Sequence, residues 1–500
     1  MNIDMKEGMK EGPDTDEKAR LTNTGAGWIL ALLSLIALMS MYTETMIIAA
    51  LPKIQSQFNT TTAWIAWVVS IYLISSSVAI PILSKLGDSY GKKKFLLVGL
   101  VFYTTGVICN GFAWNLPSLL VFRAIQGVGL AVFPLAFAII RDEFSPERVP
   151  TATGIVSAMF GAGAAIGLVV GSWIANSFGW QATYHTVIPI AVALTILAAF
   201  MLNESPIRTP SRVDVFGATT FAVAVISFLV AMTEGQNWGW TSLRIFGLLG
   251  VSLVFIILFL VIESSISDPL IDLAVLRKRN VFFVNITSFI AGLVMFMVFQ
   301  AIVYLMQLPP PFGFGTDIFR AGAVLAPGAI LMLVTAPIAG AIVARRGAKL
   351  PLFVGAAIGA AGLYYFYLFR ATQQQIALGA VIALIGVGFM FTAMINVVIQ
   401  SVAQSQTGIA TGTNAFFRTI GSAVGPPITG VYLAQYVSPL IIQTRRGPVT
   451  GPLLPNAMAF DHIFLTGFGF VVITMFVTLL IKGKVKAERM DGGEMPVDMT

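Results

Sequence analysis

The sequence has 500 residues, of which 57% are hydrophobic and only 11% are charged, and its formal net charge is +7. A soluble domain carries about 25% charged residues, so this composition excludes an ordinary soluble protein and indicates a lipid environment. The positive charge is spread over many interhelical loops on one side of the predicted membrane, which excludes a nucleic-acid-binding function.

Fourteen apolar stretches of bilayer-spanning length divide the chain. A helix needs about 20 mostly apolar residues to cross a hydrocarbon core of about 30 Å, and only helices and closed barrels satisfy their backbone groups in lipid. The sequence therefore predicts an all-α integral membrane protein with 14 transmembrane helices. The predicted spans are 27–50, 63–84, 94–113, 117–140, 152–175, 182–202, 214–232, 243–262, 281–304, 320–344, 351–370, 376–400, 408–434 and 460–482.

The basic residues predict the orientation of these helices. Most of the 30 Lys and Arg lie in the terminal segments and in the even-numbered loops. The odd-numbered loops hold only Lys53, Arg244, Arg320, Arg370, Arg445 and Arg446. Because basic residues collect in cytoplasmic loops, we expect a multi-pass protein of the plasma membrane with both termini in the cytoplasm. Residues 1–26 lack a signal-peptide pattern and are predicted, like residues 483–500, to be disordered cytoplasmic tails.

One segment of the chain occurs twice in related form. Residues 81–93 align without gaps with residues 337–349, and both copies begin with Pro-Ile and end with Gly and Lys. This repeat predicts two six-helix halves, 27–205 and 267–482, separated by an inserted helix pair at 206–266. Two parallel halves with a substrate site between them near the midplane are the architecture of major facilitator transporters.

Five segments resemble the major facilitator superfamily, specifically its fourteen-helix drug:proton antiporter branch. They are Tyr42–Pro52, Leu86–Lys93, Arg123–Gly129, Phe178–Pro189 and Pro269–Arg277. The resemblance implies the major facilitator fold. It also implies a multidrug efflux transporter that exports lipophilic or amphipathic compounds in exchange for protons by alternating access.

The resemblance is incomplete at two functional segments. In the first span the branch has an Asp where Thr43 stands, and the acid of this chain is one place further, at Glu44. In the fifth span its Gly-Pro and Gly-Gly pairs become Gly167-Leu168 and Gly171-Ser172. Because the fifth-span segment is associated with antiport, two alternatives stay open: a proton symporter or facilitator for a specific metabolite, and a transport-inactive membrane sensor.

The predicted proton-coupling residues are Glu44 and Arg123. Of the 23 Asp and Glu, Glu44 alone lies well inside a predicted span. Arg123 lies at the same predicted depth, about 9 Å below the outer surface. A neighbouring cation favours the ionised carboxylate and burial favours the neutral acid, so such a group can bind and release a proton. Alternatively, Glu44 is a permanent hydrogen-bond partner and Arg123 braces carbonyl groups of the fifth span.

The repeated loops predict a cytoplasmic gate. An acid at a helix end can pair with a base, or cap a neighbouring helix N-terminus, and so stabilise one of two alternating states. The candidate gating residues are Asp88, Gly91, Lys92, Lys93 and Arg345. The second copy has Ala344 where the first has Asp88, so we expect an asymmetric gate in which only the first copy supplies an acid. The alternative is a solvated turn that only sets the topology.

Polar side chains inside the predicted spans are candidates for substrate contact. These are Gln126, Gln300, Tyr304, Gln307, Asn396, Asn414 and Arg418. Arg418 is distinctive because a mid-span cation must face water, carbonyl groups or an anionic ligand. Single polar residues in membrane helices also serve as interhelical hydrogen bonds, which is the alternative for the whole set.

Three glycines of the fifth span, Gly163, Gly167 and Gly171, recur at every fourth residue. This spacing predicts a small-residue seam that allows close helix packing, and we expect it to face the other half.

Other chemistry is not expected. The two histidines lack a nearby Cys or acid cluster, so no metal site is predicted. No phosphate-binding loop indicates an ATP-driven pump, and no nucleophile with a base indicates an enzyme. We therefore expect no cofactor, and a monomer whose partners are a small-molecule substrate, protons and the lipid bilayer.

Overall fold

The computed structural model describes residues 23–60, 62–205, 214–266, 269–271, 273–444 and 447–482. Most of the predicted N-terminal tail and all of the predicted C-terminal tail lie outside these residues. The linker at 206–213 and the pair Arg445 and Arg446 lie outside them too.

Eight helices make up the first part of the chain. They are α1 (Asn23–Gln57), α2 (Thr62–Tyr90), α3 (Lys92–Gly111), α4 (Leu116–Val128), α5 (Val132–Glu143), α6 (Val149–Ile166), α7 (Ser172–Phe178) and α8 (Trp180–Met201). A 3₁₀ turn at Gly129–Ala131 joins α4 to α5, and a π-helical turn at Gly167–Gly171 joins α6 to α7. Each of these two pairs therefore corresponds to one predicted span.

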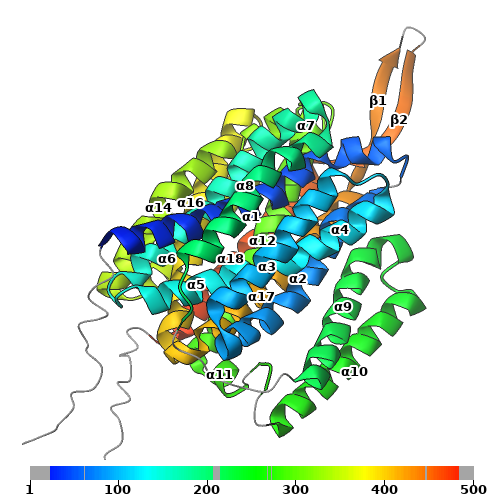
Figure 1. The fold of residues 1–500 in the computed structure, drawn as a ribbon. Coiled ribbons are helices and arrows are strands. Elements are labelled where there is room, and N and C mark those ends of the chain that lie inside the picture. Colours follow the sequence, from blue (N-terminus) through cyan, green and yellow to red (C-terminus); the bar gives the residue numbers. More distant parts are fainter. Residues whose placement is uncertain are drawn as a thin grey trace, which may run out of the picture.

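Ten helices follow. They are α9 (Val215–Trp238), α10 (Leu243–Ser265), α11 (Leu273–Arg277), α12 (Arg279–Gln307), α13 (Ile318–Ala323), α14 (Ala326–Arg346), α15 (Lys349–Leu368), α16 (Gln373–Ser401), α17 (Thr407–Gln435) and α18 (Ala457–Leu480). A 3₁₀ turn at Gln404–Gln406 precedes α17. The sequence did not predict the antiparallel hairpin of β1 (Val437–Thr444) and β2 (Gly447–Pro455), which projects from one end of the bundle (Figure 1).

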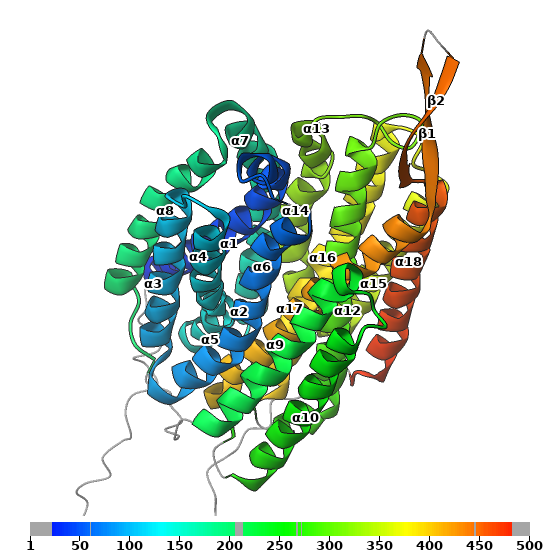
Figure 2. The ribbon, with the colours of Figure 1, turned by 90° about the vertical axis from the view of Figure 1, so that its right-hand side faces the viewer.

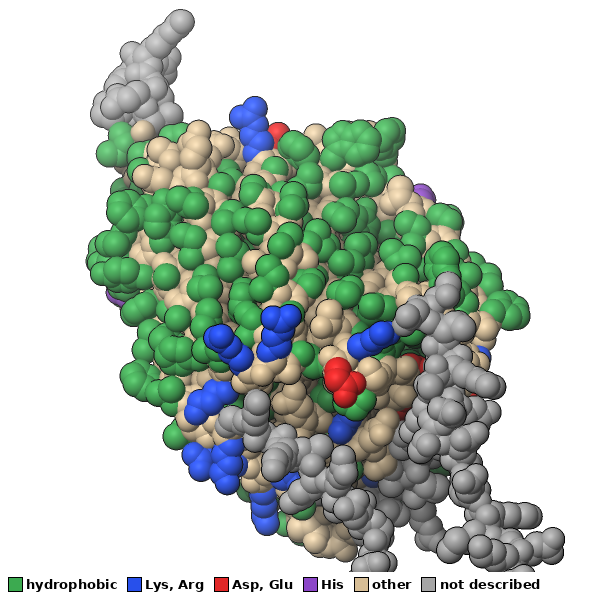
Figure 3. All heavy atoms as spheres, turned by 90° about the vertical axis from the view of Figure 1, so that its left-hand side faces the viewer, with side chains coloured by type: hydrophobic (Ala, Val, Ile, Leu, Met, Phe, Trp, Pro, Cys, Tyr) green, Lys and Arg blue, Asp and Glu red, His purple; other side chains and the backbone are tan. Residues whose placement is uncertain are grey.

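The helices form two bundles. In Figure 2, α1–α8 lie on the left, α12–α18 lie on the right, and α9 and α10 lie in front of the junction between them. We call the end where α1 begins and α18 ends the basic end, and the opposite one the hairpin end. Figure 3 shows Lys and Arg side chains gathered toward one end of a largely hydrophobic surface. Polytopic membrane proteins carry this asymmetry.

Thirteen helical segments of the described residues are long and apolar enough to cross a membrane. The remaining predicted span, 408–434, is α17, which has 29 residues but is not among the thirteen. It is rich in Gly and Thr, and it packs against protein on several sides, including α2, α5, α9 and α12. The membrane-embedded helical fold is as predicted, whereas the count of 14 crossings stays a prediction.

The repeated loops have the same local structure in both copies. Gly91 ends α2 with φ 126°, and the aligned Gly347 ends α14 with φ 83°. Positive φ is accessible to glycine without the strain that a Cβ would bring. The helices before these turns also have matching partners, because α2 packs on α17 and α14 packs on α6. These two contacts join the predicted halves in a pseudo-symmetric way.

The glycine seam of Gly163, Gly167 and Gly171 packs against α1. A Cβ at Gly163 would overlap the carbonyl oxygen of Leu38, and a Cβ at Gly171 would overlap Met46. The expectation that this seam faces the other half was therefore wrong. The contact of α6 with the second half uses other small residues, since Gly161 lies against Met332 of α14.

The inserted helix α9 contacts both bundles near the hairpin end. Trp67 Nε1 in α2 donates to Glu234 Oε1 in α9 over 2.5 Å. Gln236 Nε2 donates to the carbonyl oxygen of Pro427 in α17 over 2.9 Å. Helix α10 packs along α9 and presents most of its surface outward.

Candidate functional site

Glu44 lies in a polar stretch of α1 that is enclosed by other helices. Its side chain is 3% exposed, and Oε2 is buried without a hydrogen-bond partner in the described part of the chain. The neighbouring threonines fix α1 against the same half. Thr43 hydrogen-bonds Tyr103 of α3, and Thr45 donates to the carbonyl oxygen of Ala164 in α6 over 3.1 Å. The carboxylate is thus buried and only partly satisfied.

Arg123 is fully buried and binds mainly within its own half. Its Nε donates to the carbonyl oxygen of Val68 in α2 and its Nη1 donates to Gln126 Oε1, each over 3.0 Å. The guanidinium also lies over the ring of Tyr72, 4.2 Å from the centroid. Arg123 interacts electrostatically with Glu44, but no ion pair within 4.0 Å joins them among the described residues. The predicted carbonyl brace exists, but on α2 instead of the fifth span.

Gln126 connects these side chains to others in the first half. Its Oε1 accepts from Asn110 Nδ2 over 3.0 Å as well as from Arg123, and its Nε2 donates to Thr43 Oγ1 over 3.4 Å. The amide is 0% exposed. Gln126 therefore organises the surroundings of Glu44 in this conformation, and its role as a substrate ligand stays a prediction.

Arg418, in α17 of the second half, belongs to the same cluster. Arg418 and Arg123 both interact electrostatically with Glu44. The guanidinium carbon of Arg418 lies 5.0 Å from the ring centroid of Phe160 in α6 and 5.3 Å from that of Phe391 in α16. A cation placed over aromatic rings in this way is held by the ring quadrupoles. A cation of the second half thus acts electrostatically on the carboxylate of the first half.

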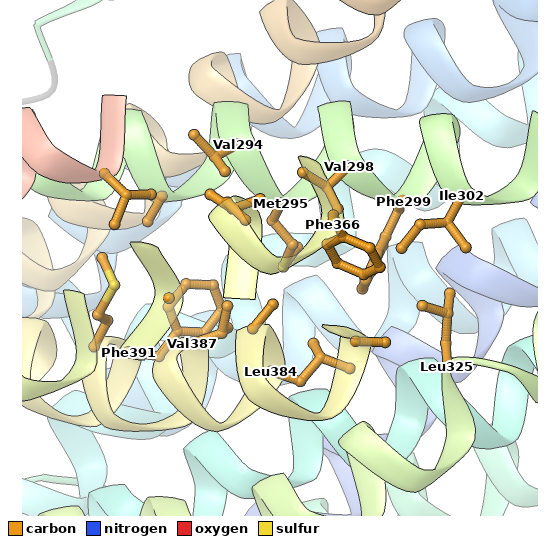
Figure 4. Close-up of a pocket in the computed structure, with 17 residues that line it drawn as sticks. Val294, Met295, Val298, Phe299, Ile302, Leu325, Phe366, Leu384, Val387 and Phe391 are labelled. Carbon is orange, nitrogen blue, oxygen red and sulfur yellow. The ribbon is translucent and has the colours of Figure 1, made fainter. Parts of the chain in front are cut away.

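Two apolar cavities adjoin this cluster. The first lies among α12, α15, α16 and α18 and has a volume of about 50 Å³ (Figure 4). The second lies between the halves, has a volume of about 20 Å³, and is lined by Met41 and Thr45 of α1 together with Phe160. Phe391 and Val387 line both cavities. The walls beside this cluster are therefore apolar, and in this conformation both cavities are smaller than a drug-sized molecule requires.

The other polar candidates lie elsewhere. Asn396 Nδ2 donates to Thr153 Oγ1 of α6 over 2.9 Å, which joins the two halves. Asn414 Nδ2 donates to Asn285 Oδ1 and Ser288 Oγ of α12 over 3.0 and 2.7 Å.

The candidates of α12 are less enclosed. Gln300 and Gln307 are half-buried and Tyr304 is 40% exposed. Within the described residues, none of Gln300, Tyr304, Gln307, Asn396 and Asn414 lines either cavity.

The basic end is closed by contacts of Asp88 with the second half. This carboxylate accepts from the backbone N–H of Gly408 over 3.1 Å and of Ile409 over 2.6 Å, in the first turn of α17. A carboxylate at a helix N-terminus satisfies free N–H groups and complements the helix dipole. Arg141 of α5 adds bonds to the carbonyl oxygens of Val402 and Ala403. In this conformation the halves are joined at the basic end.

Lys92 lies behind Asp88 and is fully buried. Its Nζ lies 2.6 Å from Asp142 Oδ2 and 3.9 Å from Asp88 Oδ1. The backbone N–H groups of Lys93 and Lys94 donate to Glu204, each over 3.1 Å. This network links the turn at the end of α2 to α5 and to the end of α8.

The second copy of the loop differs as its sequence suggests. Arg345 is exposed, and so is Ala344, which occupies the position of Asp88. Only the first copy supplies a carboxylate at this aligned position. The gating roles of Asp88, Gly91, Lys92, Lys93 and Arg345 stay predictions.

Sequence reasoning missed several residues of the site. Tyr72 and Tyr103 are fully buried next to Arg123 and Thr43, and Phe160 and Phe391 hold Arg418. A second buried acid, Glu234, lies outside this site and was also missed: it is two residues beyond the predicted end of its span, yet α9 continues to Trp238 and buries it. A longer seventh span would have found Glu234, whereas nothing in the sequence distinguishes these aromatic residues from the rest.

The sequence profile of the Major Facilitator Superfamily matches residues 33–426. The chain belongs to this superfamily. It is similar to the multidrug transporter protein MdtP of Bacillus subtilis, with 26% identity over 394 residues that cover 78% of this chain and 72% of that protein. It is also similar to the tetracenomycin C resistance and export protein of Streptomyces glaucescens, with 27% identity covering 83% and 77% of the two chains.

The solved structures agree on the fold. The human organic anion transporter MFSD10 (TETRAN) aligns with a TM-score of 0.62 and 14% identity, over 91% of this chain and 99% of that chain. At this identity the likeness shows the fold alone. Together with the superfamily match and the apolar helices, it identifies a multi-pass membrane transport protein of the major facilitator type.

Proposed function

We propose that this transporter exports lipophilic or amphipathic compounds in exchange for protons, with Glu44 as the carboxylate that binds the proton. The observation that carries the proposal is the position of Glu44, which is 3% exposed and has an unpartnered buried oxygen. A buried carboxylate without full hydrogen bonding is costly when ionised, so a proton is a natural ligand for it.

The cations around Glu44 couple its protonation to the arrangement of the two halves. Arg123 lies in the same half and Arg418 in the other, and both interact electrostatically with the carboxylate. Protonation of Glu44 removes a negative charge that attracts Arg418 across the interface. A ligand that interacts differently with two conformations shifts their populations, so the proton changes the balance between two arrangements of the halves.

The substrate class follows from the cavities beside this pair. Their walls are almost entirely apolar and include Phe160, Phe391 and Met295. Flexible Met and aromatic side chains accommodate varied apolar ligands. Relatives named as multidrug and export proteins support the direction and breadth of transport.

We also propose that the chain works as a monomer in the plasma membrane, with the basic end and both termini in the cytoplasm. Basic residues concentrate at that end, as expected of cytoplasmic loops. Glu44, Arg123, Arg418 and both cavities lie within one chain, which supports the monomer.

The test is transport in proteoliposomes with an imposed pH gradient. Lipophilic cations, neutral drugs and organic anions are screened for gradient-dependent flux in wild type, Glu44→Gln and Glu234→Gln. We expect Glu44→Gln to lose gradient-driven flux but to keep exchange of substrate down its own gradient. Glu234→Gln removes a different buried acid and keeps the gradient dependence.

Three outcomes would contradict the proposal. Gradient-driven flux at the wild-type rate in Glu44→Gln would remove the role of this carboxylate. Substrate movement in the same direction as protons would indicate a symporter. Absence of flux for every compound, together with intact binding, would indicate a sensor.

A further inference from the structure

A third pocket lies at the basic end, between the inserted pair and the second half. Side chains of α10, α11, α12 and α17 line it, among them Leu260, Val261, Arg277, Asn285 and Phe417. It has a volume of about 490 Å³. It shares no lining residue with the two cavities beside Glu44 and Arg418. It is therefore a pocket separate from both.

The pocket opens sideways from the bundle. Helix α10 packs along α9, and the α10 residues that line the pocket remain uncovered, with Ile257 52%, Leu260 44% and Val261 57% exposed. In a protein that spans a bilayer, this side faces hydrocarbon. The occupant must therefore present an apolar chain to α10 and α12.

The rim of the pocket at the basic end is cationic. Arg277, Lys278 and Arg279 follow one another at the junction of α11 and α12, and all three are exposed. Lys278 and Arg279 donate to the carbonyl oxygens of Ser401 and Leu480 over 3.4 and 2.8 Å. Arg277 lines the pocket itself. Basic pockets between transmembrane helices bind the head groups of anionic lipids.

A buried polar group in the wall points to a ligand independently. Asn285 is 2% exposed and lines the pocket. Its Oδ1 accepts from Asn414 Nδ2 over 3.0 Å, whereas its Nδ2 is buried without a partner in the described part of the chain. Buried donors in native proteins are nearly always satisfied. An acceptor brought by the occupant would satisfy this amide.

We propose that this pocket binds an anionic phospholipid of the leaflet next to the basic end. The phosphate pairs with Arg277, an ester oxygen accepts from Asn285, and one acyl chain lies between α10 and α12 against Val261. The lipid then fills the gap beside the inserted pair and attaches α10 to the second half. This site is independent of the proposed proton coupling.

The test measures lipid binding to the delipidated full-length chain in detergent. Phosphatidylglycerol and phosphatidylcholine with identical acyl chains are titrated, and bound lipid is counted by native mass spectrometry. We expect tighter binding of phosphatidylglycerol. Arg277→Gln should weaken it about fivefold, as expected for one basic residue at a membrane surface. Arg346→Gln removes an exposed cation at the same end, on α14, and should leave binding unchanged.

The acyl chain has its own test. Val261→Phe fills the pocket from an exposed position and should weaken phosphatidylglycerol binding, whereas Leu253→Phe alters an exposed residue of α10 outside the pocket and should not. The unfolding temperatures of all variants without lipid serve as the folding control.

The proposal is overturned if the two lipids bind equally, or if Arg277→Gln binds phosphatidylglycerol as wild type does. Glycerol phosphate alone should not bind. Equal binding of this soluble head group would mean a site for small anions and would also overturn the proposal.

Discussion

The guanidinium carbon of Arg418 in α17 lies 5.0 Å from the centroid of the Phe160 ring in α6. This contact joins the two halves, and Arg418 also interacts electrostatically with Glu44. The proposed proton site and the interface that must rearrange during transport therefore share one side chain.

Two substitutions of Arg418 should show how much its charge and its stacking on the aromatic rings each contribute to export. Arg418→Lys keeps a cation but loses the planar group that lies on Phe160 and Phe391, at about 0.5–2 kcal/mol for each cation–π contact. We expect gradient-driven export to fall by roughly tenfold in Arg418→Lys and to be lost in Arg418→Gln. Flux in proteoliposomes measures this, with Arg346→Lys as the control. Export by Arg418→Gln at the wild-type rate would contradict the coupling role.

Asp88 should control access at the basic end. Asp88→Asn weakens two charge-assisted hydrogen bonds to α17, each worth about 1.5–3 kcal/mol. We expect the basic end to open more often. A cysteine at the buried Ala410 in a Cys109→Ser background should then react about tenfold faster with a membrane-impermeant maleimide.

The matched control for this gate is Asp317→Asn. Asp317 also caps a helix, accepting from the backbone N–H of Arg320 over 2.8 Å, but it is exposed and lies within one half. Its removal should leave the labelling rate unchanged. Equal rates in Asp88→Asn and wild type would show that Asp88 only stabilises the fold.

The glycine seam should be intolerant of a single methyl group. In Gly163→Ala the new Cβ would overlap the carbonyl oxygen of Leu38, and such overpacking costs about 1–3 kcal/mol. Gly250→Ala on α10 is the control, since no atom lies within 4 Å of its added Cβ. We expect a lower thermal unfolding midpoint for Gly163→Ala and an equal or higher one for Gly250→Ala. The reverse order would refute the packing on α1.

Filling the apolar cavities should block lipophilic substrates. Val387 lines both cavities, so Val387→Trp places an indole in their shared wall. We expect loss of substrate binding and export with the protein still folded, at a lower unfolding temperature because the added volume overpacks the wall. Val334→Trp, at a 56% exposed position of α14, should transport normally. Unchanged substrate affinity in Val387→Trp would place the binding site elsewhere.

The positions of the helices could be predicted from the sequence because apolar length and turn residues specify them locally. The repeated loop was equally predictable, since a glycine with positive φ ends the helix in each copy. The hairpin at 437–455 could not be recognised in this way. Its strands carry several prolines and no regular alternation of apolar residues, so their pairing depends on the fold around them.

The site was less predictable because sequence gives the height of a residue but not the direction of its side chain. Glu44 and Arg123 are predicted at the same depth and do interact electrostatically, but the hydrogen bonds of Arg123 to Val68 and Gln126 were not predictable. The interaction of Arg418 with Glu44 from the other half was not predictable either. The spacing of the glycines likewise identified the small-residue seam of the fifth span, but it did not show that α1 covers this seam.

The position of α9 has a mechanical consequence. This helix is bonded to the first half through Glu234 and Trp67, and to the second half through Gln236 and Pro427. Helix α9 cannot move as a rigid body with both halves if the halves separate at the hairpin end. In an alternating-access cycle one bond would therefore have to break, and we expect the inserted pair to resist opening at the hairpin end.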